Sequence, residues 1–178
     1  MIRMRTEVAA ALKGRTLNLE AIRLAAFERT LQSIGIRDDV LAQHLNDVYL
    51  AHRFEDIELY PDVLPALAAL AGRYQMGLVS NGNSYPERCG LAGRFGFRVF
   101  SQDCGYEKPD RRIFERLLAV TACQPHEVLH VGDSLGDDVA GAQAAGIFAV
   151  WINRSRASNA SSIAPDWEIA TLTELVAG

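Results

Sequence analysis

The pattern of apolar residues changes at about Tyr60, and this change limits the possible folds more than any other feature of the chain. Before it, residues 18–35 and 38–52 carry apolar side chains at helical spacing. After it, short apolar runs alternate with helical segments. Such alternation predicts an α/β fold, with a Rossmann-like, doubly wound parallel sheet. We therefore expect an N-terminal α-helical cap, in part, over residues 1–58 and an α/β core over residues 59–178.

Capping residues indicate where several helices begin. Asn18 stands before the first helical pattern, and Asp110 stands before another. Residues 62–72 form a short helical pattern. Thr171 and Glu174 have the spacing of a capping box, which predicts a last helix at the end of the chain.

Polar side chains follow the expected strands. These strands are the apolar runs at residues 76–80, 97–101, 128–131 and 147–151. The polar residues after them are Ser80, Asn81, the segment 103–108, Asp133, Asp137 and Asp138. Ligands of doubly wound sheets bind beyond the carboxyl ends of the strands, so we expect these groups to converge there. Carboxylates favour Mg²⁺, and a hydroxyl, a lysine and backbone N–H groups suit a phosphate. The sequence thus predicts magnesium-dependent handling of a small phosphorylated metabolite.

Composition excludes several other classes of function. The net charge is −4, which argues against nucleic-acid binding because that needs a basic surface. No apolar run approaches the ~18 residues of a membrane span, and the N-terminus lacks the features of a secretory signal. The three cysteines match no zinc or redox spacing, so we expect reduced thiols in a cytoplasmic protein.

Three segments resemble one family in particular. They are LVSNGN at residues 78–83, YEKPD at 106–110 and VGDSLGDDVAGAQAAG at 131–146. In this order they resemble the second, third and fourth motifs of the haloacid dehalogenase-like hydrolases, and the resemblance runs from about Asn18 to the end of the chain. It implies that Ser80 and the backbone N–H of Asn81 bind the transferring phosphoryl group. It also implies that Lys108 balances the charge on that group and on the nucleophile.

The resemblance further implies a Mg²⁺ site. Asp133 would bind the ion directly, Asp138 matches a second acidic position that usually acts through water, and Asp137 is a further candidate ligand. One branch of the family cleaves carbon–halogen bonds without metal and resembles Ser-Ser-Asn where this chain has Val131-Gly132-Asp133. An aspartate there favours phosphoryl transfer. The implied activity is hydrolysis of a small phosphomonoester through a phosphoaspartate, with 2-haloacid dehalogenation as the weaker alternative.

The family's first motif, an Asp-x-Asp that supplies the nucleophile, has no counterpart in this sequence. The first aspartate is Asp38, in the helical half and without an apolar strand before it. We expect the chain as given to begin inside the cap, without the catalytic strand, and to be nearly inactive. By analogy, a serine protease without its catalytic triad accelerates its reaction only ~10³–10⁴-fold over water. The alternative is a non-catalytic protein that binds phosphate or a phosphorylated ligand.

The missing motif would lie on a central strand, between the strands at residues 76–80 and 128–131. Removing that strand opens a gap of roughly 10 Å, and each buried backbone group left unpaired there costs about 1–3 kcal/mol. We expect one of three repairs. The two flanking strands pair directly, residues 1–4 fill the gap, or a homodimer donates a strand; residues 1–4 are short for this role.

The four histidines are interpreted as structural. His44 lies on the apolar stripe of its helix and His52 near the end of that stripe, which predicts packing in the core or at its rim. His126 precedes the start of the strand at residues 128–131, and His130 stands near the end of that strand.

Overall fold

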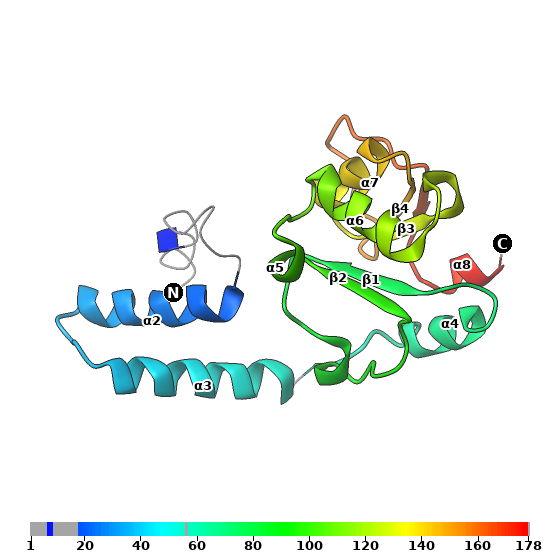
Figure 1. Cartoon of the computed structure of the whole chain (residues 1–178). Helices are drawn as coiled ribbons and strands as arrows, with labels where there is room; N and C mark the ends of the chain where they lie inside the picture. The colour runs from blue at the N-terminus through cyan, green and yellow to red at the C-terminus, as the bar shows by residue number, and fades with distance from the viewer. Residues whose placement is uncertain (1–6, 9–17, 56, 178) are drawn as a thin grey trace.

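A computed structural model of the 178-residue chain describes residues 7–8, 18–55 and 57–177 (Figure 1). The helical half contains α2 (Leu19–Ser33) and α3 (Asp39–Glu55), which lie side by side and run in opposite directions. Asn18 caps α2 as predicted, because its Oδ1 atom accepts the backbone N–H groups of Glu20 and Ala21, each at 3.0 Å.

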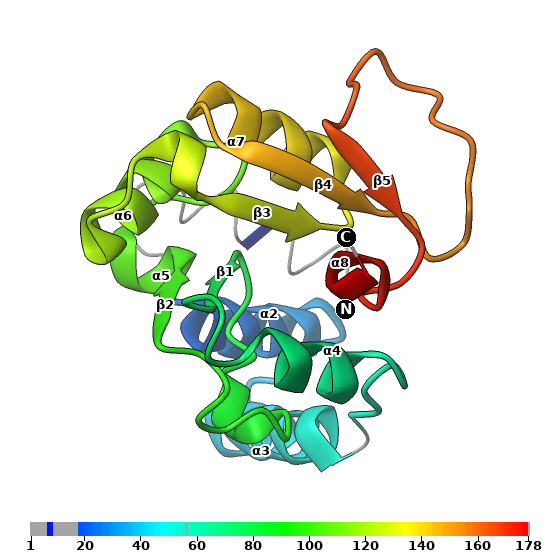
Figure 2. The same ribbon diagram turned by 90° about the vertical axis from the view of Figure 1, so that its right-hand side faces the viewer.

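The strands of the described residues form two parallel sheets. β1 (Gly77–Ser80) pairs with β2 (Phe97–Phe100), with Ser80 opposite Phe100. The second sheet has the order β3 (Leu129–Gly132), β4 (Phe148–Ile152) and β5 (Trp167–Ile169), which lie side by side in Figure 2. The first four lie where the sequence predicts strands, and β5 was not predicted. The α/β fold with parallel strands is therefore confirmed.

The remaining helices connect or flank these strands. They are α4 (Val63–Leu70), α5 (Ser101–Cys104), α6 (Arg111–Thr121), α7 (Gly141–Ala144) and α8 (Glu174–Ala177). Short 3₁₀ turns span Pro86–Arg88 and Pro125–Glu127, and a π-helical turn spans Leu135–Ala140. Asp110 begins α6 as predicted, since its Oδ1 accepts the N–H of Arg112 at 3.0 Å.

The main apolar core lies between α6 and the three-stranded sheet. Ile113 and Phe114 of α6 are fully buried and belong to one cluster with Val139 and Ala149. Gly141 lets the start of α7 approach α6 closely, because a Cβ atom there would lie 2.7 Å from the Phe114 ring. This core fixes the position of the turn after β3.

The strands on either side of the predicted gap do not pair directly. Among the described residues, β1 bonds only to β2, and β3 bonds only to β4, so β1 and β3 belong to separate sheets (Figure 2). The expectation of direct pairing is wrong, because a side chain rather than a backbone ladder links the two edges. Lys108 Nζ donates to the carbonyl of Val79 in β1 at 3.4 Å and to Asp138 after β3 at 2.5 Å. Residues 1–4 lie outside the described residues, and the homodimer stays a prediction.

The predicted packing of His44 and His52 is wrong. His44 is exposed, and 71% of the His52 side chain is accessible to solvent. In the described part of the chain α3 packs chiefly against α2, so most of its circumference faces water. Ala42 and Asn46 face inward instead, at 0% and 5% exposure.

None of the helices in the described ranges has the length and apolar character needed to cross a membrane.

Candidate functional site

Ser80 ends β1 and begins a tight polar loop. Its Oγ accepts the N–H of Gly82 at 3.0 Å, which closes the turn directly after the strand. A serine hydroxyl has one proton to donate and two lone pairs to accept. Acceptance of the Gly82 N–H therefore leaves the Ser80 proton for an oxygen of a ligand.

Asn81 clamps this loop to the segment that carries Lys108. The Asn81 Oδ1 accepts the backbone N–H of Lys108 at 2.6 Å, and its Nδ2 donates to the Lys108 carbonyl at 2.9 Å. The Asn81 carbonyl in turn accepts the hydroxyl of Ser101 at 3.2 Å. The side chain of Asn81 thus positions Lys108, while the predicted contact of its backbone N–H with phosphate stays a prediction.

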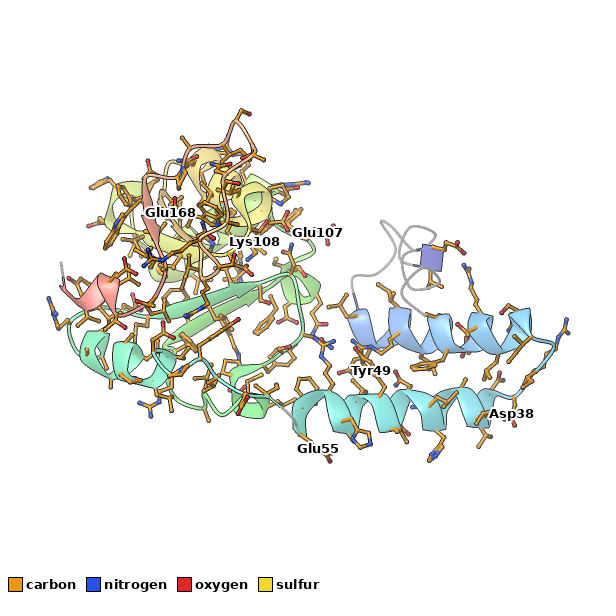
Figure 3. The ribbon with its side chains drawn as sticks, turned by 180° about the vertical axis from the view of Figure 1, so that it is seen from behind. Asp38, Tyr49, Glu55, Glu107, Lys108 and Glu168 are labelled. Atoms are coloured by element: carbon orange, nitrogen blue, oxygen red, sulfur yellow. The ribbon has the colours of Figure 1, made fainter. Side chains whose placement is uncertain are left out.

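Lys108 lies in the interior between the two sheets, where Figure 3 labels it. Its ammonium group forms an ion pair with Asp138, with 2.5 Å between Nζ and Oδ1, and the two side chains are 12% and 5% exposed. The second contact of Nζ is the Val79 carbonyl, one residue before Ser80. The structure therefore brings together Ser80, Asn81, Lys108 and Asp138 at the carboxyl ends of β1 and β3.

Asp138 is the acceptor at the centre of this group. Burial alone would raise its pKa, but hydrogen bonds from His130 and Lys108, the charge of Lys108 and the N–H of Ser134 outweigh burial and hold the pKa well below its usual range. Gly132 makes room for it, because a Cβ atom at that position would lie 2.1 Å from Asp138 Cγ. The carboxylate is therefore ionised and fixed in place.

His130 is a site residue that sequence reasoning missed. It lies on β3 and is 9% exposed. Its Nε2 is 3.0 Å from Asp138 Oδ1, and its ring packs edge-on against Phe114, with 5.1 Å between centroids. The sequence does place His130 on the strand that leads into the aspartate-rich turn. Because alternate residues of a strand share one face, this position could have indicated that its side chain lies near the turn.

Asp133 and Asp137 stand apart from this cluster. Both are exposed, and each takes part in a hydrogen bond through its backbone: the Asp133 carbonyl accepts Trp151 Nε1 at 3.0 Å, and the Asp137 N–H donates to Ser134 Oγ at 3.0 Å. The π-helical turn thus directs Asp138 inward and leaves its acidic neighbours facing solvent.

The donor set fits a Mg²⁺ ion only in part. No group of three His, Cys, Asp or Glu side chains in the described ranges gathers to hold a metal. Both oxygens of Asp138 already accept hydrogen bonds, from Lys108, His130 and the Ser134 N–H. Asp133 remains as one exposed carboxylate, and one or two carboxylates with water and substrate phosphate are a common Mg²⁺ environment. Metal binding by Asp133, Asp138 or Asp137 stays a prediction.

A family model described as "Hydrolase: haloacid dehalogenase-like hydrolase" matches residues 5–146, which is most of the chain. The chain belongs to the haloacid dehalogenase-like hydrolases. The resemblance carried by the three sequence motifs is thereby confirmed, and the cluster around Lys108 contains residues from all three.

Among characterised relatives of this haloacid dehalogenase-like chain, pyrimidine 5'-nucleotidase YjjG of Escherichia coli is 31% identical over 137 residues, covering 74% of this chain and 61% of the relative. Other relatives carry phosphatase names. The chain spans between 47% and 66% of the length of the curated relatives it matches.

Solved structures share the fold. A 2-haloacid dehalogenase from Pseudomonas syringae superposes with a TM-score of 0.83 at 31% identity, over 97% of this chain and 76% of that one. The HAD-hydrolase YfnB from Bacillus subtilis, bound to magnesium, gives a TM-score of 0.74 at 23% identity, over 97% and 77% of the two chains, a likeness of fold alone. The relatives of this hydrolase thus include both phosphatases and dehalogenases.

Proposed function

We propose that this chain carries the phosphate-binding part of a phosphatase that acts on a small phosphomonoester. The observation that supports this most is the partly buried Lys108 ammonium, which pairs with Asp138 and donates to the Val79 carbonyl directly before Ser80. An ammonium beside a free hydroxyl proton and backbone N–H groups is suited to a phosphate dianion. The phosphatase names among the relatives agree with this choice.

Asp133 is the residue that favours phosphoryl transfer over dehalogenation. It is exposed directly after β3, at the end of the strand where doubly wound sheets bind their ligands, so a cation held there would lie on the same side of the fold as the proposed phosphate. Mg²⁺ at this position would neutralise phosphate charge during transfer. Halide displacement offers no phosphate for a cation to bind, so an exposed carboxylate there would have no such use.

Turnover through a phosphoaspartate needs a nucleophilic carboxylate beside the bound phosphate. Asp138 is unsuited to this role, because both of its oxygens already accept hydrogen bonds. The first aspartate of the sequence is Asp38, so no aspartate before the helical half is present to supply this carboxylate. We therefore propose that these residues bind phosphate and Mg²⁺ with little hydrolysis of their own.

The test combines binding with turnover. Calorimetry of the full chain with inorganic phosphate, with and without Mg²⁺, should show binding that Mg²⁺ strengthens, and Asp133→Asn should remove the effect of Mg²⁺. Asp39→Asn, which changes an exposed carboxylate on α3 outside the candidate site, is the matched control.

An aryl phosphate and 2-chloropropionate then serve as substrates. Almost no release of phenol or chloride is expected. Rapid, Mg²⁺-dependent phenol release would show that another carboxylate is the nucleophile. Metal-independent chloride release would replace the phosphatase assignment with dehalogenation.

A further inference from the structure

The loop that begins at Ser80 also meets the helical half of the chain. Arg53, in the last turn of α3, donates from Nη2 to Ser84 Oγ at 3.2 Å. Figure 3 shows that the end of α3 at Glu55 is the end nearest the strands. Ser84 lies only four residues after Ser80, so an α3 side chain reaches the same loop as the proposed phosphate site.

Arg53 carries a positive charge, and no acidic side chain of the described residues pairs with it. Its other contacts are a 3.5 Å approach of Nη1 to the Tyr49 hydroxyl and a position 5.6 Å from the Phe54 ring centroid. Arg88, on the 3₁₀ turn after the loop and 5.3 Å from the Phe54 ring centroid, pairs with Glu20 at 3.7 Å. Among the described residues Arg53 makes no ion pair, so its charge is available to an anion.

Asn83 provides an independent sign of an unmet polar contact in this loop. Its side chain is completely buried, yet within the part of the chain that the structure describes neither Nδ2 nor Oδ1 has a hydrogen-bond partner. It stands between Gly82, which bonds to Ser80, and Ser84, which bonds to Arg53. Buried amides without partners are rare in folded proteins because they lose the hydrogen bonds of water. A ligand group that enters this loop would provide the missing partner.

The reach of the backbone limits the size of such a ligand. Four residues span at most about 14 Å when fully extended, and the bend in which the Tyr85 N–H bonds to the Asn83 carbonyl at 3.1 Å shortens this path. The span is an upper limit, and it keeps Arg53 and Asn83 within the length of a small molecule whose phosphate binds at Ser80.

We propose that Arg53, Ser84 and Asn83 form a second subsite that binds an anionic group of the substrate. A guanidinium pairs with a carboxylate or a phosphate through two parallel hydrogen bonds, and the bond from Arg53 to Ser84 would be exchanged for such a pair. The Asn83 amide would donate to the same anion. The substrate class is then a small phosphomonoester with a second anion. This inference rests on the proposed phosphate site.

Calorimetry of the full chain with Mg²⁺ tests the subsite with three probes. They are 2-phosphoglycolate, with a carboxylate, 1,2-ethanediol bisphosphate, with a second phosphate, and ethyl phosphate, with neither. At least one of the two probes with a second anionic group should bind about 10- to 100-fold more tightly than ethyl phosphate, the range of a charge-assisted pair. The tighter of the two identifies the second anion.

The variants separate the subsite from a general effect of charge. Arg53→Met should remove the preference while leaving ethyl phosphate affinity unchanged, and Arg53→Lys should keep part of it. Arg29→Met, at an exposed position on α2, is the control and should retain the preference. Circular dichroism checks that each variant folds, and Arg53→Lys serves if Arg53→Met does not.

Two results would overturn the inference. Equal affinity of the wild type for all three probes, or an unchanged preference in Arg53→Met, would refute the subsite while leaving the phosphate site in place. A chain that binds neither ethyl phosphate nor inorganic phosphate would refute the proposed function as well.

Discussion

His130 Nε2 and Lys108 Nζ approach the same oxygen of Asp138, at 3.0 Å and 2.5 Å. One carboxylate therefore ties β3 to the loop that precedes α6, and the Val79 carbonyl extends this link to β1. In the described residues this side-chain group joins two sheets that share no backbone hydrogen bond. The position of Lys108 beside Ser80 thus depends on both partners of Asp138.

The contribution of His130 to this arrangement is testable by replacing its ring. In His130→Phe the contact with Phe114 persists, but Asp138 loses one hydrogen bond. Hydrogen bonds to charged groups contribute about 1.5–3 kcal/mol, so the free energy of unfolding should fall by that amount. Inorganic phosphate should also bind more weakly, because Lys108 is less firmly held. Urea denaturation and calorimetry measure the two effects.

His130→Gln is the conservative comparison, because its amide N–H can replace the Nε2 donor. It should recover much of the phosphate affinity. Equal losses in the Phe and Gln variants would indicate that packing, and not the hydrogen bond, is what His130 supplies.

The lowered pKa of Asp138 predicts a loss of stability in acid. A carboxylate whose pKa is lower in the folded protein than in the unfolded chain stabilises the fold fully above the unfolded value, here 3.8. As the pH falls below this value, protonation favours the unfolded chain by up to about 1.4 kcal/mol per pH unit. Asp138→Asn should therefore be much less stable than wild type at pH 7. The gap between their free energies of unfolding should become smaller below pH ~4.

Urea denaturation in metal-free buffer at several pH values measures this gap. Asp137→Asn, at the exposed neighbouring position, should follow the wild-type curve. A constant gap between wild type and Asp138→Asn down to pH ~2 would contradict the assignment of the acid sensitivity to this carboxylate.

Because Gly132 lies close to Asp138, alanine substitutions at Gly132 and Gly136 should have different effects on the free energy of unfolding. In Gly132→Ala the new Cβ would fall 2.1 Å from Asp138 Cγ, so either β3 or the π-helical turn must shift. Overpacking of this kind typically costs about 1–3 kcal/mol, and the shift should also weaken phosphate binding. Gly136→Ala meets no atom within 4 Å and should change the free energy of unfolding by less than about 0.5 kcal/mol. Thermal and urea denaturation of the two variants decide between these expectations.

The elements that were predictable from the sequence are those with a local chemical cause. Asn18 and Asp110 begin helices because their side chains satisfy N–H groups two or three residues away. Glu174 likewise accepts the N–H of Thr171 at 2.9 Å, as its spacing predicts. The four predicted strands are short, mostly apolar runs, which are typical of parallel sheets.

The features that were missed depend on contacts between distant residues. Asp62 precedes α4 but makes no capping bond; its carboxylate accepts Arg154 Nη1 at 3.0 Å and the Leu172 N–H at 2.7 Å. β5 has only three residues and is a strand because β4 lies beside it. His130 was missed for the same reason, since its partner becomes visible only when the turn after β3 folds back. Periodicity and spacing carry no information on such long-range partners.

The unpaired amide of Asn83 predicts that one substitution will improve stability and impair recognition at once. Leucine has nearly the same shape as asparagine, and replacing a buried polar group that has no partner removes a desolvation cost of about 1–3 kcal/mol. Asn83→Leu should therefore raise the free energy of unfolding while it weakens the preference for a probe with a second anionic group over ethyl phosphate. The matched control is Asn81→Leu, which should be destabilised because this substitution removes both hydrogen bonds between Asn81 and Lys108.

Urea denaturation and calorimetry of the two variants distinguish the possible results. If Asn83→Leu is stabilised and keeps its preference, Asn83 takes no part in binding. If Asn83→Leu is destabilised, the Asn83 amide has a hydrogen-bond partner in solution.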